Sequence, residues 1–494
     1  MSIPSELPEG WVRVRLDQVA EVRLGRQRSP KNHIGTHMRP YLRAANVDWN
    51  GLKLDDVKEM NFTDDELAVY RLKKGDIVLS EASGSPSEVG KPAIWNDEIA
   101  DCCLQNTLIR VRSHGVDPNY LFHFLRSEAI RGAFVEHSRG VGIHHIGSAR
   151  LAAWQVPVPP LEEQQRIVAA LEEQLSRLDA AVGNAVEVRK KLLAYKASRE
   201  LEIVPSPKSG TGEQVLPDGW RMVRLSDISH SSGYGTSAKC GYEGDGSAVL
   251  RIPNIQSGSI DPDDLKYALD VGLDLNAYKV KAGDLLVVRT NGSRDLIGRV
   301  AVSHEDTEYA FASYLIRFKI KTEIASPDWV ARVLSTRPWR RLIEAAAAST
   351  AGQYNLNLKK LGSLPIVLPP VEQQLSLTVA LDEIDESVRR LTSAVDDASL
   401  KGEALRRSLL TEAFAGRLVS QNPADESIEA LLDRIRTERE AAGAAKSRRR
   451  SPRRAPAQRK RTPDTGPAPD VPLPARADAP ATATQPTLDL EMPS

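Results

Sequence analysis

The sequence predicts an α/β (α+β) protein in which two copies of a mixed α/β domain are separated by two long helices that form an antiparallel coiled coil. The first observation is an internal repeat: a Leu-Pro-Glu-Gly-Trp segment ending at Trp11 returns 209 residues later as Leu-Pro-Asp-Gly-Trp, ending at Trp220. The second is a Pro-Pro pair, at 159–160 and again at 369–370, that each time opens a long stretch of helical spacing. The repeat unit is a whole domain, because solenoid units span only about 20–50 residues.

The repeat places the first mixed α/β domain over residues 1–158 and the second over residues 216–368. Strand-like runs in both copies, such as Leu285–Val288, are short and are bounded by Gly, Asn, Ser and Pro. Helices are expected to begin after Asp117 and Ser326, because each is a polar cap residue followed by proline in the first turn.

Long helices are expected to follow the Pro-Pro pairs, over residues 159–202 and 369–420, because proline disfavours helix before it and is tolerated in a first turn. Apolar residues then recur at spacings of three and four, the heptad pattern of a coiled coil. A helix of about 40 residues is roughly 60 Å long, which favours pairing of the two helices over packing of each on its own domain. Because globular domains intervene, an antiparallel pair is expected. The predicted seam consists of Val168, Leu171, Leu175, Leu178 and Val182 in the first helix and Leu377, Leu381, Ile384, Val388, Leu391 and Val395 in the second.

The remaining segments are a linker at 203–215, a short C-terminal helix at 421–440, and a disordered tail at 441–494 that is first basic and then rich in Pro and Ala. The formal net charge is zero. From Lys446 onward there are ten basic and five acidic residues, so residues 1–445 carry a net charge of −5. A surface that binds nucleic acid must therefore be a local basic patch.

Composition places the chain in the cytoplasm. No apolar run approaches the roughly 18 residues of a membrane span, and the first residues lack the basic and apolar regions of a signal peptide. The three cysteines form neither a disulfide framework nor a CxxC metal pair, and buried thiols fit a reducing compartment. We expect no membrane partner.

Motifs of catalysis are missing. The Pro-Pro pairs lack the Asn/Asp and aromatic flanks with which base methyltransferases hold a flipped base. The segment Gly84–Pro92 resembles a phosphate loop but has one residue too many and ends in proline. His144 and His145 are adjacent, and neighbouring residues rarely point the same way, so a metal site is disfavoured. We predict no catalytic residue, no metal ligand and no cofactor bound by this chain.

Polar and basic loops do recur at matching places in the two copies. Arg, Asn, Gln and Ser are the side chains that pair with base edges and phosphates. The loops differ while the framework around them agrees, which favours two related scaffolds reading different half-sites of double-stranded DNA over ordinary solvated loops. The candidate DNA-binding residues are Arg26, Arg28, Lys31, Arg43, Asn46, Ser83, Ser85, Arg139, His144 and His145 in the first copy, and Tyr234, Lys239, Arg251, Asn254, Arg289, Asn291, Ser293, Arg294, Gln353, Tyr354 and Asn355 in the second.

This combination resembles the specificity subunits of type I restriction–modification systems over about residues 7–420. The resemblance rests on the two Leu-Pro-x-Gly-Trp segments, the Pro-Pro-x-Glu-(Glu)-Gln-Gln helix openings and the run from Arg406 to Val419 at the end of the second helix. It implies two target-recognition domains that each read one half of a bipartite DNA sequence, with the coiled coil setting their spacing and docking the methyltransferases. It also implies two modification subunits that use S-adenosylmethionine, and two restriction subunits that use ATP and Mg. The specificity subunit itself is then non-catalytic.

Two alternatives remain open. A fused restriction or methylation enzyme is disfavoured by the missing motifs, and binding of S-adenosylmethionine by the chain alone would revive it. The other alternative is a scaffold that joins two proteins through its coiled coil, without DNA. A gel shift with randomised DNA, selected in the presence of the modification subunit, distinguishes all three functions.

Overall fold

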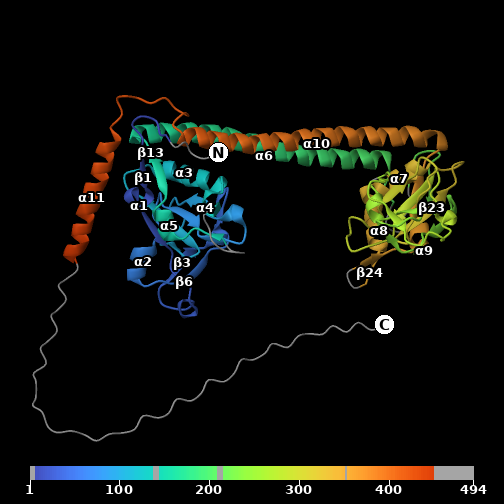
Figure 1. Ribbon diagram of the computed structural model, residues 1–494, viewed down its shortest axis with the longest axis horizontal. Helices are drawn as coiled ribbons and strands as arrows, with labels where there is room; N and C mark the ends of the chain where they lie inside the picture. The colour runs from blue at the N-terminus through green and yellow to red at the C-terminus, as the bar shows by residue number, and fades with distance from the viewer. Residues whose placement is uncertain (1–5, 137–143, 208–214, 257, 351–352, 450–494) are drawn as a thin grey trace, which may run out of the picture. The chain divides into compact units, whose positions relative to one another are not determined.

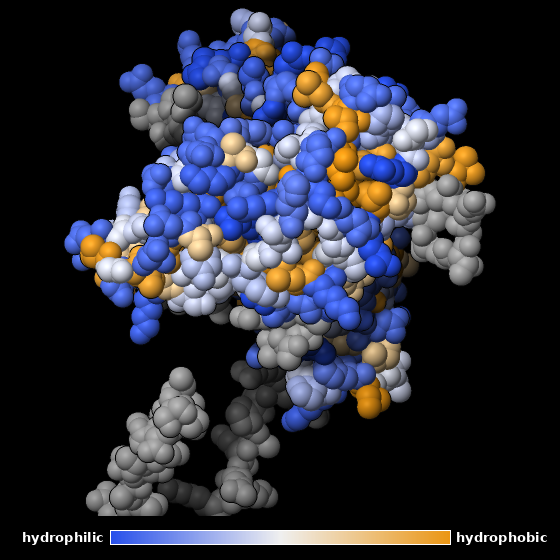
Figure 2. Space-filling model, turned by 90° about the vertical axis from the view of Figure 1, so that its right-hand side faces the viewer, coloured by the Kyte–Doolittle hydropathy of each residue, from blue (hydrophilic) through white to orange (hydrophobic). Residues whose placement is uncertain are grey.

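The computed structural model describes residues 6–136, 144–207, 215–256, 258–350 and 353–449. Contacts divide the chain into two compact units, Met1–Arg436 and Thr437–Ser494, and the domains below belong to the first. None of the described helices is long and apolar enough to span a membrane. Figure 2 shows a face on which hydrophilic side chains predominate and hydrophobic side chains form separate patches.

The first domain, in which helices α3, α4 and α5 are labelled in Figure 1, is built on a four-stranded antiparallel sheet with the order β2-β11-β7-β9. These strands are β2 (Ala20–Leu24), β11 (Leu108–Ser113), β7 (Ile77–Ser80) and β9 (Pro92–Ile94), and α3 (Pro118–Ile130) contacts β9 and β11. The other elements are β1 (Val12–Arg15), α1 (Leu16–Val19), η1 (Pro30–Asn32), β3 (Met38–Leu42), η2 (Ala44–Asn46), β4 (Val47–Asp48), β5 (Gly51–Leu52), β6 (Lys58–Asn61), α2 (Asp64–Tyr70), β8 (Ala82–Ser83), η3 (Pro86–Glu88), β10 (Cys103–Leu104), α4 (Ala133–Glu136), β12 (His144–His145), α5 (Ser148–Ala152) and β13 (Gln155–Val158).

The second domain repeats this sheet with the order β15-β23-β19-β21. These strands are β15 (Ser229–Tyr234), β23 (Leu315–Ile320), β19 (Asp284–Val288) and β21 (Val300–Val302), and α7 (Pro327–Ser335) takes the place of α3. The other elements are β14 (Arg221–Arg224), β16 (Cys240–Gly241), β17 (Ala248–Leu250), η4 (Ile252–Asn254), β18 (Lys266–Ala268), η5 (Asn276–Tyr278), β20 (Thr290–Asn291), β22 (Ala310–Phe311), α8 (Arg337–Ala346), β24 (Ala348–Thr350), β25 (Gln353–Asn355), α9 (Leu358–Gly362) and β26 (Pro365–Leu368).

The two predicted helix starts are confirmed. The Asp117 carboxylate accepts hydrogen bonds from the N–H groups of Asn119 (2.8 Å) and Tyr120 (3.1 Å), and the Ser326 hydroxyl accepts one from Trp329 (3.5 Å). These bonds satisfy N–H groups that the first turn of a helix leaves without partners.

The long helices α6 (Leu161–Ile203) and α10 (Val371–Phe414) begin directly after the Pro-Pro pairs. A glutamine in each first turn joins the helix to its domain. The Gln164 side chain accepts a hydrogen bond from the Asp117 N–H (2.8 Å) and donates one to the carbonyl of Pro159 (2.8 Å). Gln374 makes the same pair of bonds with Ser326 (2.6 Å) and Pro369 (3.0 Å). Both glutamines are fully buried, so each helix leaves its domain in a fixed direction.

The antiparallel pairing of α6 and α10 is confirmed by ion pairs along their length. Asp179 pairs with Arg406, Arg189 with Asp396 (3.6 Å) and Lys196 with Asp385 (2.9 Å), so residue numbers fall on α10 as they rise on α6. Gly402 is buried at this contact, where a Cβ atom would lie 3.0 Å from Cγ2 of Val182. The glycine therefore allows close approach of the two helices.

The predicted seam is wrong at Leu391, which is 47% exposed. The seam of α10 instead runs through Val388, Thr392, Val395 and Gly402, which are all at least partly buried. Thr392 places a buried hydroxyl there without a hydrogen-bond partner among the described residues. The sequence pattern favoured Leu391 because it is more apolar than its neighbour Thr392. In the structure, packing against α6 fixes which of the two residues faces the seam.

The ends of the helices also complete the domain cores. Leu410, Ala413 and Phe414 of α10 belong to the core of the first domain, and Leu381 of α10 belongs to that of the second. Gly416 follows α10 with a φ of 68°, and a Cβ atom there would lie 2.3 Å from Cγ of Pro8. The end of α10 therefore lies against the start of the first domain.

The short C-terminal helix begins later than expected. Helix α11 spans Ile428–Arg449, and its first turns bury Ile428, Leu431 and Ile435 in the core of the first domain. The expected tail boundary at residue 441 is wrong for residues 441–449, which continue the helix, because alanine and arginine are strong helix formers. The rest of the expected tail, 450–494, lies outside the described residues.

Candidate nucleic-acid interface

In each domain, two loops that are distant in sequence are joined by a short strand pair. In the first domain β8 pairs with β12, so that Ser83 lies opposite His144 and Ala82 opposite His145. In the second domain β20 pairs with β25 at the equivalent place, with Asn291 opposite Tyr354. We call residues 82–88 with 144–145 the first loop pair, and residues 289–294 with 353–355 the second loop pair. The structure thus brings together candidate residues that lie about 60 positions apart.

The first loop pair presents small polar side chains. Ser85 is exposed, and its hydroxyl lies 3.0 Å from that of Ser87. The Ser83 hydroxyl accepts a hydrogen bond from the N–H of Ser85 (3.1 Å). His145 is exposed with its Nδ1 3.8 Å from the Glu81 carboxylate, and His144 is half-buried. Arg139, also a candidate, lies outside the described residues.

The second loop pair presents a cation and an aromatic ring. Arg294 and Ser293 are exposed, and the guanidinium of Arg294 lies 5.5 Å from the centre of the Tyr354 ring. The Asn291 side-chain oxygen accepts a hydrogen bond from the N–H of Ser293 (2.7 Å), which shapes the turn. Gln353 lies on β25. An arginine held against an aromatic ring is suited to contacts with bases and phosphates.

Arg289 has a different role from the one expected. Its guanidinium donates to the carbonyls of Leu356 (3.2 Å) and Ser313 (3.2 Å) and to the side chain of Asn355 (2.9 Å), and it lies over the ring of Tyr234. These bonds tie the base of the second loop pair together. Arg289 is therefore a structural residue. Asn355 and Tyr234, which contact its guanidinium, also take part in this structural cluster.

The backbone at this point is the same in both domains while the side chain differs. The carbonyl of Glu81 accepts from Ile146 (3.0 Å) as the carbonyl of Arg289 accepts from Leu356 (2.8 Å). The acidic residue Glu81 in the first domain thus stands where the second domain has the basic residue Arg289. The two loop pairs therefore have opposite charges at equivalent positions.

Asn46 and Asn254 are also structural. Both are buried, and each donates to two backbone carbonyls: Asn46 to Lys53 and Asp56, and Asn254 to Asp261 and Asp264. Their side-chain oxygens accept from the N–H groups of Arg43 and Arg251. Because the buried side chains of both asparagines already donate and accept hydrogen bonds within the protein, they are not available to contact a DNA base. The prediction that these asparagines read DNA is therefore corrected.

Arg43 and Arg251 complete the same clamp. Each pairs with an aspartate thirteen residues later, Arg43 with Asp56 (2.6 Å) and Arg251 with Asp264 (3.0 Å). Because the clamp is identical in the two domains, it cannot encode two different half-sites. We now assign these arginines to the shared framework.

The remaining candidates divide by exposure. Arg26 is held by Glu66 (2.7 Å), by the carbonyl of Asn61 (2.7 Å) and over the ring of Phe62, which makes it structural too. Arg28, Lys31 and Lys239 are exposed, and Arg28 donates to His33 (3.0 Å). These three remain predicted DNA contacts.

Sequence reasoning missed a pocket of about 670 Å³ beside the first loop pair. Its wall includes Ser87 of that loop pair, Trp49 and Arg126. The only sequence signal was an arginine within the apolar run of α3, a pattern that is common on helices at a domain surface.

The described residues contain no group of three or more His, Cys, Asp or Glu side chains placed to hold a metal ion. Burial raises the pKa of Cys102 and of Cys103 to about 12. Both thiols are therefore protonated at neutral pH, which makes them poor nucleophiles.

Comparison with known proteins identifies relatives that match most of the chain. Residues 8–187 match the type I restriction modification DNA specificity domain. The StySPI specificity subunit of Salmonella potsdam is 26% identical over 467 residues, covering 90% of this chain and 99% of the relative. The EcoKI specificity subunit of Escherichia coli K12 is 26% identical over 473 residues, with the same coverage.

Two solved structures share the fold. A chain from a structural study of assembly and conformational transition of the type I R-M system matches with a TM-score of 0.66 and 21% identity, covering 84% of this chain and all of that one. The HsdS subunit of Thermoanaerobacter tengcongensis matches with a TM-score of 0.52 and 22% identity, covering 84% and 99%.

Proposed function

We propose that this chain, a homologue of the type I restriction specificity subunits in sequence and in fold, is the subunit that reads DNA sequence in a type I restriction–modification complex. The observation that supports this function concerns the first and second loop pairs. They lie at the same place in two copies of one domain but have different side chains. A shared scaffold with different loops is what a bipartite target requires.

The chemistry of such a complex belongs to other subunits. Modification subunits would supply S-adenosylmethionine and the adenine-methylating site, and restriction subunits would supply ATP- and Mg-dependent translocation and cleavage. This chain would supply sequence recognition. Its two domains would each contact one half-site, and α6 with α10 would set the distance between the half-sites. Two modification and two restriction subunits would match the duplicated architecture.

The coiled coil offers a surface for docking modification subunits. The seam residues of a coiled coil occupy heptad positions a and d. In this coiled coil Val182 of α6 is at position a, and Gly402 of α10, which faces it, is at position d. In an antiparallel pair the g positions of both helices lie on the same side of the seam, and the e positions lie on the other. The g positions are apolar and exposed: Ala181, Val188 and Tyr195 on α6, and Leu391, Ala398 and Leu405 on α10.

The opposite side of the coiled coil is mixed. Its e positions include Asp179 and Asp396, which both pair with arginines of the facing helix, and the exposed apolar residues Val186 and Leu193. We call the six g-position residues the g stripe. All six are apolar, and such an exposed stripe favours a protein partner on that side, which supports docking of the methyltransferases there.

The function is tested by mixing the full-length chain with its modification subunit and S-adenosylmethionine, and offering DNA with randomised sequence. We expect methylation only where two fixed half-sites flank a spacer of constant length. Methylation without sequence preference, or uptake of S-adenosylmethionine by this chain alone, would contradict the proposal.

A further inference from the structure

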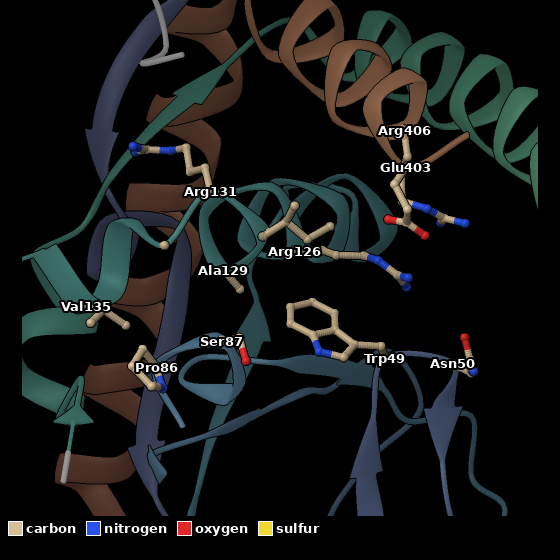
Figure 3. Close-up of a pocket in the computed structure, with 12 residues that line it drawn as sticks. Trp49, Asn50, Pro86, Ser87, Arg126, Ala129, Arg131, Val135, Glu403 and Arg406 are labelled. Carbon is tan, nitrogen blue, oxygen red and sulfur yellow. The ribbon is translucent and has the colours of Figure 1, made fainter. Parts of the chain in front are cut away.

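The pocket of about 670 Å³ lies where the first domain meets α10. Trp49 and Asn50 come from the turn between β4 and β5, and Ser87 comes from η3 of the first loop pair (Figure 3). Arg126 comes from α3, and Arg406 from α10. The pocket is thus built by elements that the fold holds rigidly together.

Arg126 differs from the other two arginines of this pocket. Arg131 is bound by the carboxylate of Glu128 (2.7 Å), and Arg406 is paired with Asp179. Among the described residues no carboxylate forms an ion pair with Arg126, although Asp179 and the pocket residue Glu403 attract its charge from farther away. The buried Nε of Arg126 has no hydrogen-bond partner. Figure 3 shows Arg126 directed past the indole of Trp49, and Arg131 directed away from it.

The guanidinium of Arg126 is held in place by aromatic rings. Its central carbon lies 6.0 Å from the centre of the Trp49 ring and 5.9 Å from that of Phe122. The indole is fixed in turn, because its N–H donates to Glu88 (3.2 Å). A partly buried cation without a directly paired anion is unfavourable for the folded chain alone, whereas a bound anion would relieve the cost.

The surroundings indicate which anion. Ser87 and Asn50 line the same pocket, and serine, asparagine and arginine are typical phosphate contacts. Ser87 is also joined to Ser85 of the first loop pair, with 3.0 Å between their hydroxyl oxygens. A DNA strand whose bases meet the first loop pair would therefore carry a backbone phosphate next to the pocket.

Building on the proposed function, we propose that this pocket binds one phosphate of the DNA backbone beside the first half-site, with Arg126 as its charged ligand. The contact fixes position and carries no sequence information. It belongs to the first domain only: the residue equivalent to Arg126 in α7 is Ser335, whose hydroxyl donates to the carbonyl of Ala331 (2.8 Å). The nearby Arg332 is already paired with Asp385 (2.7 Å).

The test compares Arg126→Gln and Arg126→Lys with the control Arg15→Gln in the complex with the modification subunit; Arg15 is an exposed arginine of the first domain that pairs with Asp17 (2.6 Å) and lies outside the pocket. DNA affinity is measured from low to high salt on a cognate and on a scrambled duplex. Arg126→Gln should weaken binding by roughly three- to tenfold on both duplexes at low salt, and it should reduce the slope of log affinity against log salt by about 0.9, the value for one phosphate. Arg126→Lys should retain the slope, and Arg15→Gln should match the wild type.

The phosphate itself is located by uncharged methylphosphonates placed one at a time along the cognate duplex. One position beside the first half-site should weaken wild-type binding and have no further effect on Arg126→Gln. Thermal unfolding of each variant shows that it is folded.

An unchanged salt slope in Arg126→Gln, while the wild type still selects its sequence, would overturn this inference and leave the proposed function standing. Loss of binding to the modification subunit, with DNA contacts unchanged, would show that an acidic protein side chain fills the pocket and would equally overturn it. Failure of the wild-type complex to select any sequence would instead contradict the proposed function.

Discussion

The side chain of Gln164 accepts a hydrogen bond from the backbone N–H of Asp117 over 2.8 Å, and this bond joins the first turn of α6 to the first turn of α3. Gln374 and Ser326 repeat the bond in the second domain. The glutamine that marks the start of each long helix in the sequence is thus the residue that fixes the helix to its domain.

Replacing Gln164 with alanine should lower the free energy of unfolding of the first domain by about 1–3 kcal/mol, because it leaves a buried N–H and a buried carbonyl without partners. Gln165→Ala is the matched control, since Gln165 is exposed on the same turn. Urea unfolding of the two variants measures the difference. Equal stability would show that the bond contributes nothing.

The coiled coil should act as a ruler. Residues 182–188 of α6 face residues 396–402 of α10, so removing both segments shortens each helix by one heptad and keeps the seam in phase. The loss of seven residues shortens the helices by roughly 10 Å, and the preferred spacer should become shorter while both half-sites stay the same. Methylation of a library with randomised spacer length gives the result. An unaltered spacer would contradict the ruler.

The two domains should read DNA independently. Arg294→Ala with Asn291→Ala should relax base preference in one half-site by roughly tenfold or more, because one good bidentate contact contributes about 1–3 kcal/mol of discrimination. The other half-site serves as the internal control in base-by-base methylation of a library. Arg289→Ala should instead destabilise the second loop pair, since its guanidinium holds backbone carbonyls. Equal loss in both half-sites would assign Arg294 and Asn291 to the fold.

The g stripe should bind the modification subunit. Tyr195→Glu and Leu391→Glu should each weaken this association at least tenfold, because they place an unpaired charge in an apolar contact. Leu193→Glu is the control, since Leu193 is 52% exposed at an e position on the other side of the seam. Sedimentation of the mixed subunits measures the association. Stronger weakening by the control would move the docking surface to the side of the e positions.

His123 should make the first domain sensitive to acid. Burial, and to a lesser extent the nearby Arg126, lower the pKa of His123 to about 4, below its value of about 6.5 in unfolded chains. Between these values the unfolded chain binds a proton that the folded chain does not, so the stabilisation is present above pH 6.5 and is lost as pH falls towards 4. The loss should reach about 3 kcal/mol. His123→Gln should remove this part of the pH dependence in unfolding measured from pH 7 to pH 4, and an identical pH profile would contradict it.

The sequence by itself determined the duplicated domain, the antiparallel helices and their starting points. These features depend on neighbours along the chain: proline excludes helix before it, Asp117 and Ser326 cap the turns that follow them, and heptad spacing gives each helix one apolar side. These features depend on interactions between residues that are close in sequence, so they can be predicted without knowledge of the tertiary structure.

Only the tertiary structure decided which polar residues face outward. Asn46 and Ser85 look alike in sequence, yet carbonyls seven and ten residues away bury the first and leave the second exposed. The seam runs through Thr392 rather than Leu391 because α6 sets the register of α10. Arg126 has no direct ion pair because the fold leaves the nearby carboxylates of Glu403 and Asp179 beyond ion-pair distance. The role of each of these side chains depends on partners that only folding brings within reach.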